Sequence, residues 1–186
     1  MADEFIIQAA DVRKSYGNVE ALAGVDLRIP RGAVCGLLGR NGAGKTTTIK
    51  VLLGMVRPTS GRASVFGLPA SDPEASLEIR RRAAFVSEDK DLYSGVTVGA
   101  LLRFTAPFYP KWRADRAGEY LAAFELRADA ATHELSRGMR TKLALLLALS
   151  TGAELLILDE PMSGLDPAAI EQVLKVIVRQ AGRDGT

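Results

Sequence analysis

One short segment restricts the fold of this chain more than any other. Residues 39–46 read GRNGAGKT, which fits the pattern G-x-x-x-x-G-K-[ST]. The apolar run AVCGLLG (33–39) precedes it and predicts a strand covered on both faces. The pattern KTTTIKVLLGMV (45–56) follows it and predicts a helix. A strand, a glycine-rich turn and a helix in this order are typical of a phosphate-binding loop in an α/β protein.

The residue types of this loop suit a polyphosphate. Glycines let the backbone turn its N–H groups inward, and the following helix adds the positive end of its dipole. Lys45 can reach the β- and γ-phosphates, and the Thr46 hydroxyl can bind Mg²⁺. A glycine turn with a chance lysine is the alternative. The predicted nucleotide contacts in the loop are Gly39, Asn41, Gly42, Ala43, Gly44, Lys45, Thr46 and Thr47.

The rest of the chain predicts an α/β fold with a helical insertion. Residues 5–17 and 20–32 alternate with period two, which predicts an N-terminal β part. Helical patterns fill the region of about 96–150, inside a single domain of residues 1–186. Further strands are predicted at 61–67, 83–87 and 153–160, and further helices at 73–82 and 167–182.

Composition excludes several classes of protein. The 186 residues are 47% hydrophobic and carry a net charge of +2, too weak a basic excess to favour nucleic acid as a partner. Cys35 is the single cysteine, so no internal disulfide is possible, and we expect it to be a buried, inert thiol. No secretory signal or membrane-spanning stretch is visible, which predicts a cytosolic chain.

Two acidic residues follow the predicted strand in LLILDE. Asp159 and Glu160 lie at its carboxyl end, the edge at which open parallel sheets bind ligands. Asp159 would then hold Mg²⁺, and Glu160 would orient or deprotonate an attacking water. The alternative is an acidic turn that caps the next helix. Because the same sequence also contains a phosphate-binding loop, the functional interpretation of the two acidic residues is favoured.

Ser136 opens the apolar helix in HELSRGMRTKLALLLALS (133–150). A serine at this place can cap the helix, and the free N–H groups of a helix start can also bind an anion. The stretch alone leaves both roles open.

Taken together and in order, these segments resemble the ATP-binding subunits of ABC transporters over nearly the whole chain. GRNGAGKTT and LLILDEP resemble the Walker A and Walker B elements of that family. MSGLDP resembles its D-loop, with Asp166 as the acid, and LSRGM stands in the place of its signature. Tyr16 matches an aromatic residue that stacks on adenine.

The resemblance implies a P-loop NTPase fold of the RecA-like type. A parallel sheet core would carry an N-terminal antiparallel β part and a helical subdomain. It also implies ATP and Mg²⁺ as ligands, a head-to-tail dimer with a second ATP-binding subunit, and a transmembrane permease as partner on the inner face of the membrane. Ser136 and the Gly138 amide would meet the γ-phosphate that the partner subunit binds.

The chain departs from the family pattern in its signature and its Q-loop. Arg137 and Met139 replace a glycine and a glutamine of the signature, a version that resembles subunits of exporters of drugs, peptides or lipids. Arg137 could approach the phosphates of the opposed subunit or be solvated. Glu88 stands where the family has the Q-loop glutamine, and it could bind Mg²⁺ and water or be a solvated loop acid.

The switch histidine of the family has no counterpart in the sequence. His133, the single histidine, is in the wrong place to substitute and is expected to be exposed. The family's switch strand would begin where the chain stops, at Thr186, so we expect a truncated version of a longer subunit that alone folds and hydrolyses ATP poorly. In similar domains that strand lies between the two that carry Walker A and Walker B.

The leading hypothesis is therefore a transport ATPase subunit. One alternative is a related ATPase that acts on nucleic acid or ribosomes, although the coiled coils and basic extensions typical of those proteins are absent from the sequence. The other is a nucleotide-dependent scaffold without turnover, which Glu88 and the short C-terminal region favour.

Overall fold

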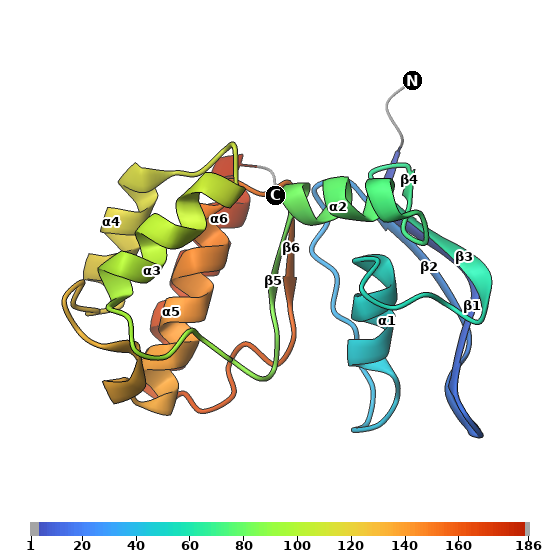
Figure 1. Cartoon of the computed structure of the whole chain (residues 1–186), viewed down its shortest axis with the longest axis horizontal. Coiled ribbons are helices and arrows are strands. Elements are labelled where there is room, and N and C mark those ends of the chain that lie inside the picture. The colour runs from blue at the N-terminus through green and yellow to red at the C-terminus, as the bar shows by residue number, and fades with distance from the viewer. Residues whose placement is uncertain (1–3, 185–186) are drawn as a thin grey trace. The chain divides into compact units, whose positions relative to one another are not determined.

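The computed structural model describes residues 4–184, and the chain forms two compact units, Met1–Arg80 and Arg81–Thr186. Figure 1 shows the elements of each unit. Of the domain range predicted from the sequence, residues 1–3 and 185–186 lie outside the described part. Within the described part, no helix is long and apolar enough to cross a membrane.

The first unit is built on a four-stranded antiparallel sheet with the order β2-β1-β3-β4. Its strands are β1 (Phe5–Tyr16), β2 (Val19–Pro30), β3 (Ser60–Val65) and β4 (Leu68–Pro69). Ile7 and Val12 of β1 are both buried, although they lie an odd number of residues apart, because the register of β1 against β2 shifts between Ala9 and Val12. Helix α1 (Lys45–Leu52) packs against β2 and β3 through Ile49, Val51 and Leu52. The predicted N-terminal antiparallel part is confirmed.

The apolar run before the phosphate loop differs from its prediction. Residues 33–40 form no strand, and all eight are exposed, with Val34 at 90% and Leu38 at 93%. Cys35 is exposed as well, so the predictions of a covered strand and of a buried thiol are both wrong. The reason is that hydrophobicity alone does not make a strand. A strand needs backbone partners, and this run joins neither of the two described sheets.

The second unit combines a short parallel sheet with a group of helices. Strands β5 (Ala83–Val86) and β6 (Leu155–Leu158) pair in parallel, from Ala83 opposite Leu155 to Val86 opposite Leu158. The strand predicted at 153–160 is thus shorter and only half-buried. Its helices are α3 (Val98–Thr105), η1 (Ala106–Phe108), α4 (Ala114–Ala123), η2 (Thr132–Glu134), α5 (Arg137–Ser150) and α6 (Pro167–Asp184).

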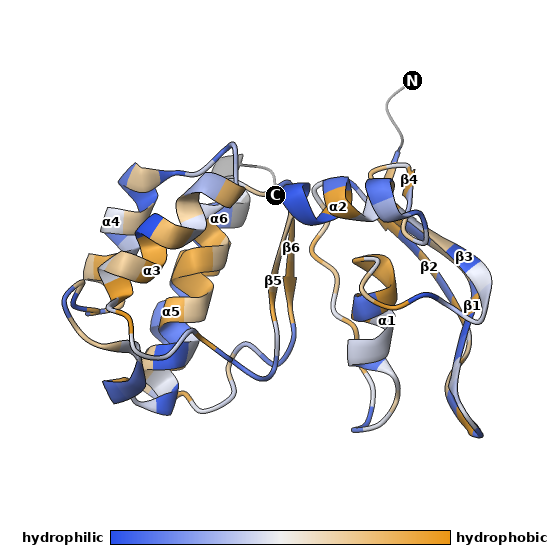
Figure 2. Ribbon diagram, in the orientation of Figure 1, coloured by the Kyte–Doolittle hydropathy of each residue, from blue (hydrophilic) through white to orange (hydrophobic). Residues whose placement is uncertain are grey.

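Helix α5 is central to the second unit, because it contacts α3, α4, α6 and β5. Leu143, Leu145 and Leu146 are fully buried in the same core as Val98 and Phe124. Figure 2 shows apolar ribbon along most of α5 and along β5 and β6, whereas the first turn of α5 is polar. Because the rest of α5 is packed in the core, the position of its polar first turn is fixed.

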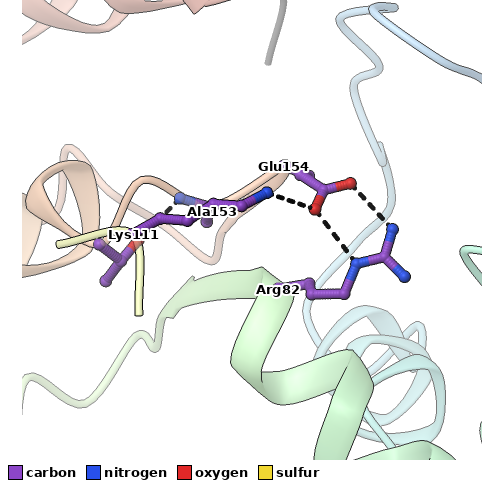
Figure 3. Close-up of polar contacts among 5 residues, drawn as sticks. Arg82, Lys111, Ala153 and Glu154 are labelled. Carbon is purple, nitrogen blue, oxygen red and sulfur yellow. Dashed lines mark hydrogen bonds and ion pairs between the residues drawn. The ribbon is translucent and has the colours of Figure 1, made fainter. Parts of the chain in front are cut away.

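The start of β6 is fixed by an ion-paired carboxylate. Glu154 accepts two hydrogen bonds from Arg82, at 2.8 and 3.2 Å, and one from Lys111 at 3.0 Å. Figure 3 shows both side chains converging on Glu154. Hydrogen bonds from Arg82 and then from Lys111 lower the pKa of Glu154 to about 2 against the opposing effect of burial. Arg82 ends helix α2 (Pro73–Arg82), so this helix end and β6 are tied together.

Candidate functional site

The phosphate loop lies in the first unit, between β2 and α1. Gly44 is the N-cap of α1, with φ 85°, and Gly42 also has a positive φ of 82°. The Lys45 ammonium folds back over the loop and donates to the carbonyl oxygens of Gly39 at 2.8 Å and Arg40 at 3.4 Å. The loop therefore places a cation beside the N-terminus of a helix, the arrangement that binds phosphate groups.

Close packing against β2 explains why Gly44 is a glycine. A Cβ atom there would lie 2.5 Å from the Ala21 carbonyl oxygen and 2.5 Å from Leu22 Cδ2. Thr48 closes the first turn of the helix by donating from its N–H and its hydroxyl to the Gly44 carbonyl. Thr46, predicted to bind Mg²⁺, and Thr47 are half-buried on that turn, while Asn41 and Ala43 are exposed.

Tyr16, the predicted adenine contact, ends β1 in the same unit. Its side chain is 50% exposed, and the Lys14 ammonium lies 4.8 Å from the centre of its ring. Lys14 is itself held by the Arg57 carbonyl at 2.9 Å. An exposed ring with a fixed cation on one face keeps a surface on which a base can stack.

The predicted acidic residues lie in the second unit, at the carboxyl ends of β5 and β6. Asp159 is buried, and its N–H extends the strand pairing by donating to the Val86 carbonyl at 2.9 Å. Glu160 is exposed and adopts a left-handed backbone with φ 48°. Glu88 is exposed just beyond the end of β5. The parallel pairing thus puts Asp159 and Glu160 at the carboxyl edge of the sheet, as the sequence predicts, and Glu88 follows the neighbouring strand at the same edge.

Lys90 links these acidic residues, and its part in the site was not foreseen from the sequence. Its ammonium donates to the backbone carbonyls of Glu88 and Glu160, each at 3.0 Å. Burial lowers the pKa of Lys90, against the opposing effect of the Glu88 and Asp159 carboxylates. The only signal in the sequence is the place of Lys90 two residues after Glu88, which does not reveal a partner seventy residues away.

The signature segment begins α5. Ser136 is the N-cap, and its hydroxyl accepts a hydrogen bond from the Met139 N–H at 3.2 Å, so it takes the capping role, one of the two that the sequence left open. Its contact with a γ-phosphate stays a prediction. Gly138 lies on the first turn of the helix, and His133 is exposed in η2, as expected.

The segment that resembles a D-loop joins β6 to α6. Asp166 accepts a hydrogen bond from the Ala169 N–H at 2.8 Å and so caps α6. Ser163, which the sequence did not single out, receives a hydrogen bond from Arg137 at 2.8 Å. Arg137 therefore forms a hydrogen bond within its own chain. The sequence had suggested only that it approaches the phosphates of the opposed subunit or is solvated.

The residues present fit a nucleotide with a magnesium ion. The first turn of any helix leaves N–H groups without partners inside the helix. In α1 this turn begins with Lys45 and directly follows the two positive-φ glycines of the loop. Within the described residues, no group of three or more histidine, cysteine or acidic side chains is placed so that it could hold a metal ion by itself. Magnesium needs only one or two protein oxygens when phosphates and water complete its shell, so the Thr46 hydroxyl beside the loop is compatible with an ion bound to the nucleotide.

The fold and the loop together define a P-loop nucleotide-binding protein of the α/β class. A family model described as ABC transporter matches residues 22–163, which is most of the chain. The chain therefore belongs to the ABC transporter ATP-binding family.

Curated relatives agree with this family. The chain is 38% identical over 169 residues to the probable multidrug ABC transporter ATP-binding protein YbhF of Escherichia coli, covering 88% of this chain and 29% of the relative. It is 35% identical over 174 residues to the bacitracin transport ATP-binding protein BcrA of Bacillus licheniformis, with 92% and 56% covered. A Nod factor export ATP-binding protein of Cupriavidus metallidurans is 39% identical, with 88% and 55% covered. The chain thus spans less than two thirds of the length of each.

Solved structures show the same architecture. An ATP-binding subunit of an ABC transporter matches with a TM-score of 0.86 and 32% identity, over 96% of this chain and 75% of that chain. The cbiO1 protein of Clostridium perfringens, described as part of a transporter complex, matches with a TM-score of 0.80 and 28% identity, over 98% and 76%. A dimeric bacterial ABC transporter cassette matches with a TM-score of 0.85 and 25% identity, over 96% and 84%.

Proposed function

We propose that this chain binds ATP and Mg²⁺ and hydrolyses ATP as part of a transporter's ATP-binding subunit. The observation that carries the proposal is the phosphate loop itself. Its lysine lies over a glycine-capped helix start, in a chain of the ABC transporter family. Tyr16, at the end of β1, would stack on the adenine.

The residues divide the chemistry between them. Lys45 and the loop N–H groups bind the β- and γ-phosphates, and Glu160 accepts a proton from the water that attacks the γ-phosphorus. Thr46, Asp159 and Glu88 would hold Mg²⁺, which when bound neutralises charge on the phosphate oxygens. The bond between the γ-phosphorus and the bridging oxygen breaks, and ADP leaves with inorganic phosphate.

A second ATP-binding subunit would complete each site. Ser136 and the Gly138 N–H lie at the start of α5, where a helix offers free donors to an anion. In a head-to-tail dimer they would meet the γ-phosphate bound by the partner's loop. Nucleotide then favours the closed dimer, because only that state contacts the γ-phosphate from both sides.

A membrane permease is the proposed second partner, with the chain on the cytoplasmic face of the membrane. Three exposed aromatic side chains support this, because Tyr93, Phe104 and Phe108 form two edge-to-face contacts beside the loop that carries Glu88. Exposed aromatic groups of this kind are enriched in protein interfaces. The names of the relatives include multidrug transporter, bacitracin transport and Nod factor export, which favours an exporter of drugs, peptides or lipids.

The substitution Glu160→Gln tests the proposal in the complete native subunit. It keeps the size of the side chain but removes the proton acceptor, so phosphate release should fall by about a hundredfold or more while ATP-bound dimers accumulate. Phosphate release and sedimentation with ATP and Mg²⁺ measure both effects. Lys45→Ala is the control and should abolish binding itself. Monomers of the Glu160→Gln variant at saturating nucleotide would contradict the dimer model, and a native subunit without turnover would indicate a scaffold.

A further inference from the structure

The Arg137 side chain lies along the segment that follows Asp159. Its guanidinium donates to the Ser163 hydroxyl at 2.8 Å, across 26 residues of sequence. Its aliphatic part covers the backbone of Gly164, where a Cβ atom would lie only 2.7 Å from Arg137 Cδ and Nε. Gly164 has a φ of 80°, so its backbone conformation disfavours a side chain there, and the arginine would have to shift to admit one.

The same segment contacts the first turns of α5 at two other places. A Cβ atom on Gly138 would lie 3.4 Å from the Gly164 carbonyl oxygen, so the two backbones approach closely. The buried Thr141 hydroxyl lies 3.3 Å from the Ser163 carbonyl oxygen. The start of α5 and the turn at Ser163 therefore form one packed contact, with Arg137 as its charged member.

This turn also sets the backbone of Glu160. The Ser163 N–H donates to the Glu160 carbonyl at 3.1 Å, and the Leu165 N–H donates to the Met162 carbonyl at 3.2 Å. Glu160 has a φ of 48°, which costs about 1 kcal/mol or more for a residue with a side chain and persists only when neighbouring contacts hold it. The Lys90 ammonium donates to the same carbonyl at 3.0 Å.

We propose that Arg137 is a positioning residue for Glu160. By fixing Ser163 it holds the turn that keeps the Glu160 backbone left-handed, and so it sets the direction of the carboxylate. Arg137 directly follows Ser136, so the segment proposed to contact a partner's nucleotide is joined to the turn that carries the chain's own proton acceptor. The inference rests on the proposed function only for its kinetic consequence.

The first test needs no nucleotide and no activity. Arg137→Met keeps an aliphatic chain over Gly164 but removes the guanidinium, so the turn should open more often. Hydrogen exchange of the amides in residues 160–166 should become about fivefold faster or more in the complete native subunit. Arg127→Met is the matched control, because the Arg127 side chain forms an exposed ion pair with Asp129. Unchanged exchange in Arg137→Met would overturn the proposal whether or not the protein is an ATPase.

The second test separates positioning from binding. Arg137→Met and Ser163→Ala should each lower kcat by about tenfold and leave the KM for ATP within about twofold, because the phosphate loop is untouched. The double variant should lose no more than either single one, since both remove the same hydrogen bond. Arg137→Lys, which keeps a donor, should recover part of kcat. Additive losses would show that the two side chains act independently, and a rise in KM with kcat unchanged would assign Arg137 to nucleotide binding. Either result would overturn the proposal.

Discussion

At the residue scale, the phosphate loop depends on two glycines that both have a positive φ but lie in different surroundings. Gly42 and Gly44 have φ values of 82° and 85°. Nothing lies within 4 Å of a Cβ placed on Gly42, whereas a Cβ on Gly44 would strike the Ala21 carbonyl and Leu22. A side chain at Gly42 would therefore cause backbone strain alone, whereas a side chain at Gly44 would cause backbone strain and a steric clash.

Alanine substitutions at these two positions should differ in their effect on stability. Gly42→Ala should lower the free energy of unfolding by about 1 kcal/mol, the cost of a left-handed alanine. Gly44→Ala should lower it by about 1–3 kcal/mol more, because the loop must also move away from β2. Urea denaturation measures both. Equal losses would show that the loop relaxes freely and that packing against β2 does not fix it.

At the scale of elements, the parallel pair β5 and β6 carries the acidic edge, and charged groups hold that pair at both ends. Lys90 binds carbonyls beyond the carboxyl ends, while Glu154 binds Arg82 and Lys111 at the start of β6. Two strands alone make a marginal sheet, so these contacts matter more than they would in a wide one.

Glu154 should make the stability of the chain depend on pH in a defined direction. In the folded state it keeps its charge down to a pKa of about 2, whereas in the unfolded chain it binds a proton near 4.5. The stabilisation is therefore complete above pH 4.5 and is lost as the pH falls towards 2.

The variant Glu154→Gln should accordingly be less stable at pH 7 by about 1 kcal/mol, a value that allows for screening by solvent. The difference from the wild type should shrink as the pH is lowered from 4.5 towards 2. Urea denaturation at several pH values measures it, with Glu78→Gln, an exposed glutamate on α2, as the control. A difference that does not change with pH would mean that packing, not the ion pairs, is responsible.

At the scale of the whole molecule, the proposed function would draw on groups from each compact unit and from a second copy. The phosphate loop and Tyr16 belong to the first unit, and Glu88, Asp159, Glu160 and Ser136 to the second. Ser136 has two proposed tasks, because its hydroxyl caps α5 and would also face the partner's γ-phosphate.

Ser136→Asp should separate these two tasks. Aspartate caps a helix as well as serine does, so the free energy of unfolding should stay within about 0.5 kcal/mol of the wild type. Its negative charge would repel the γ-phosphate, so nucleotide-dependent dimers of the complete subunit should be lost in sedimentation experiments. A dimer of undiminished affinity would leave Ser136 with its capping task alone.

Local patterns in the sequence determined much of this protein, because they depend on near neighbours in the chain. The two N-terminal strands and the helix that begins at Lys45 appear as predicted, and Ser136 takes the capping role that the sequence had left open. The tertiary structure decided which groups meet across long separations. It left residues 33–40 without strand partners and exposed, and it joined Arg137 to Ser163 and Lys90 to Glu160. A strand and a long polar side chain both take their place from partners that only the folded chain supplies.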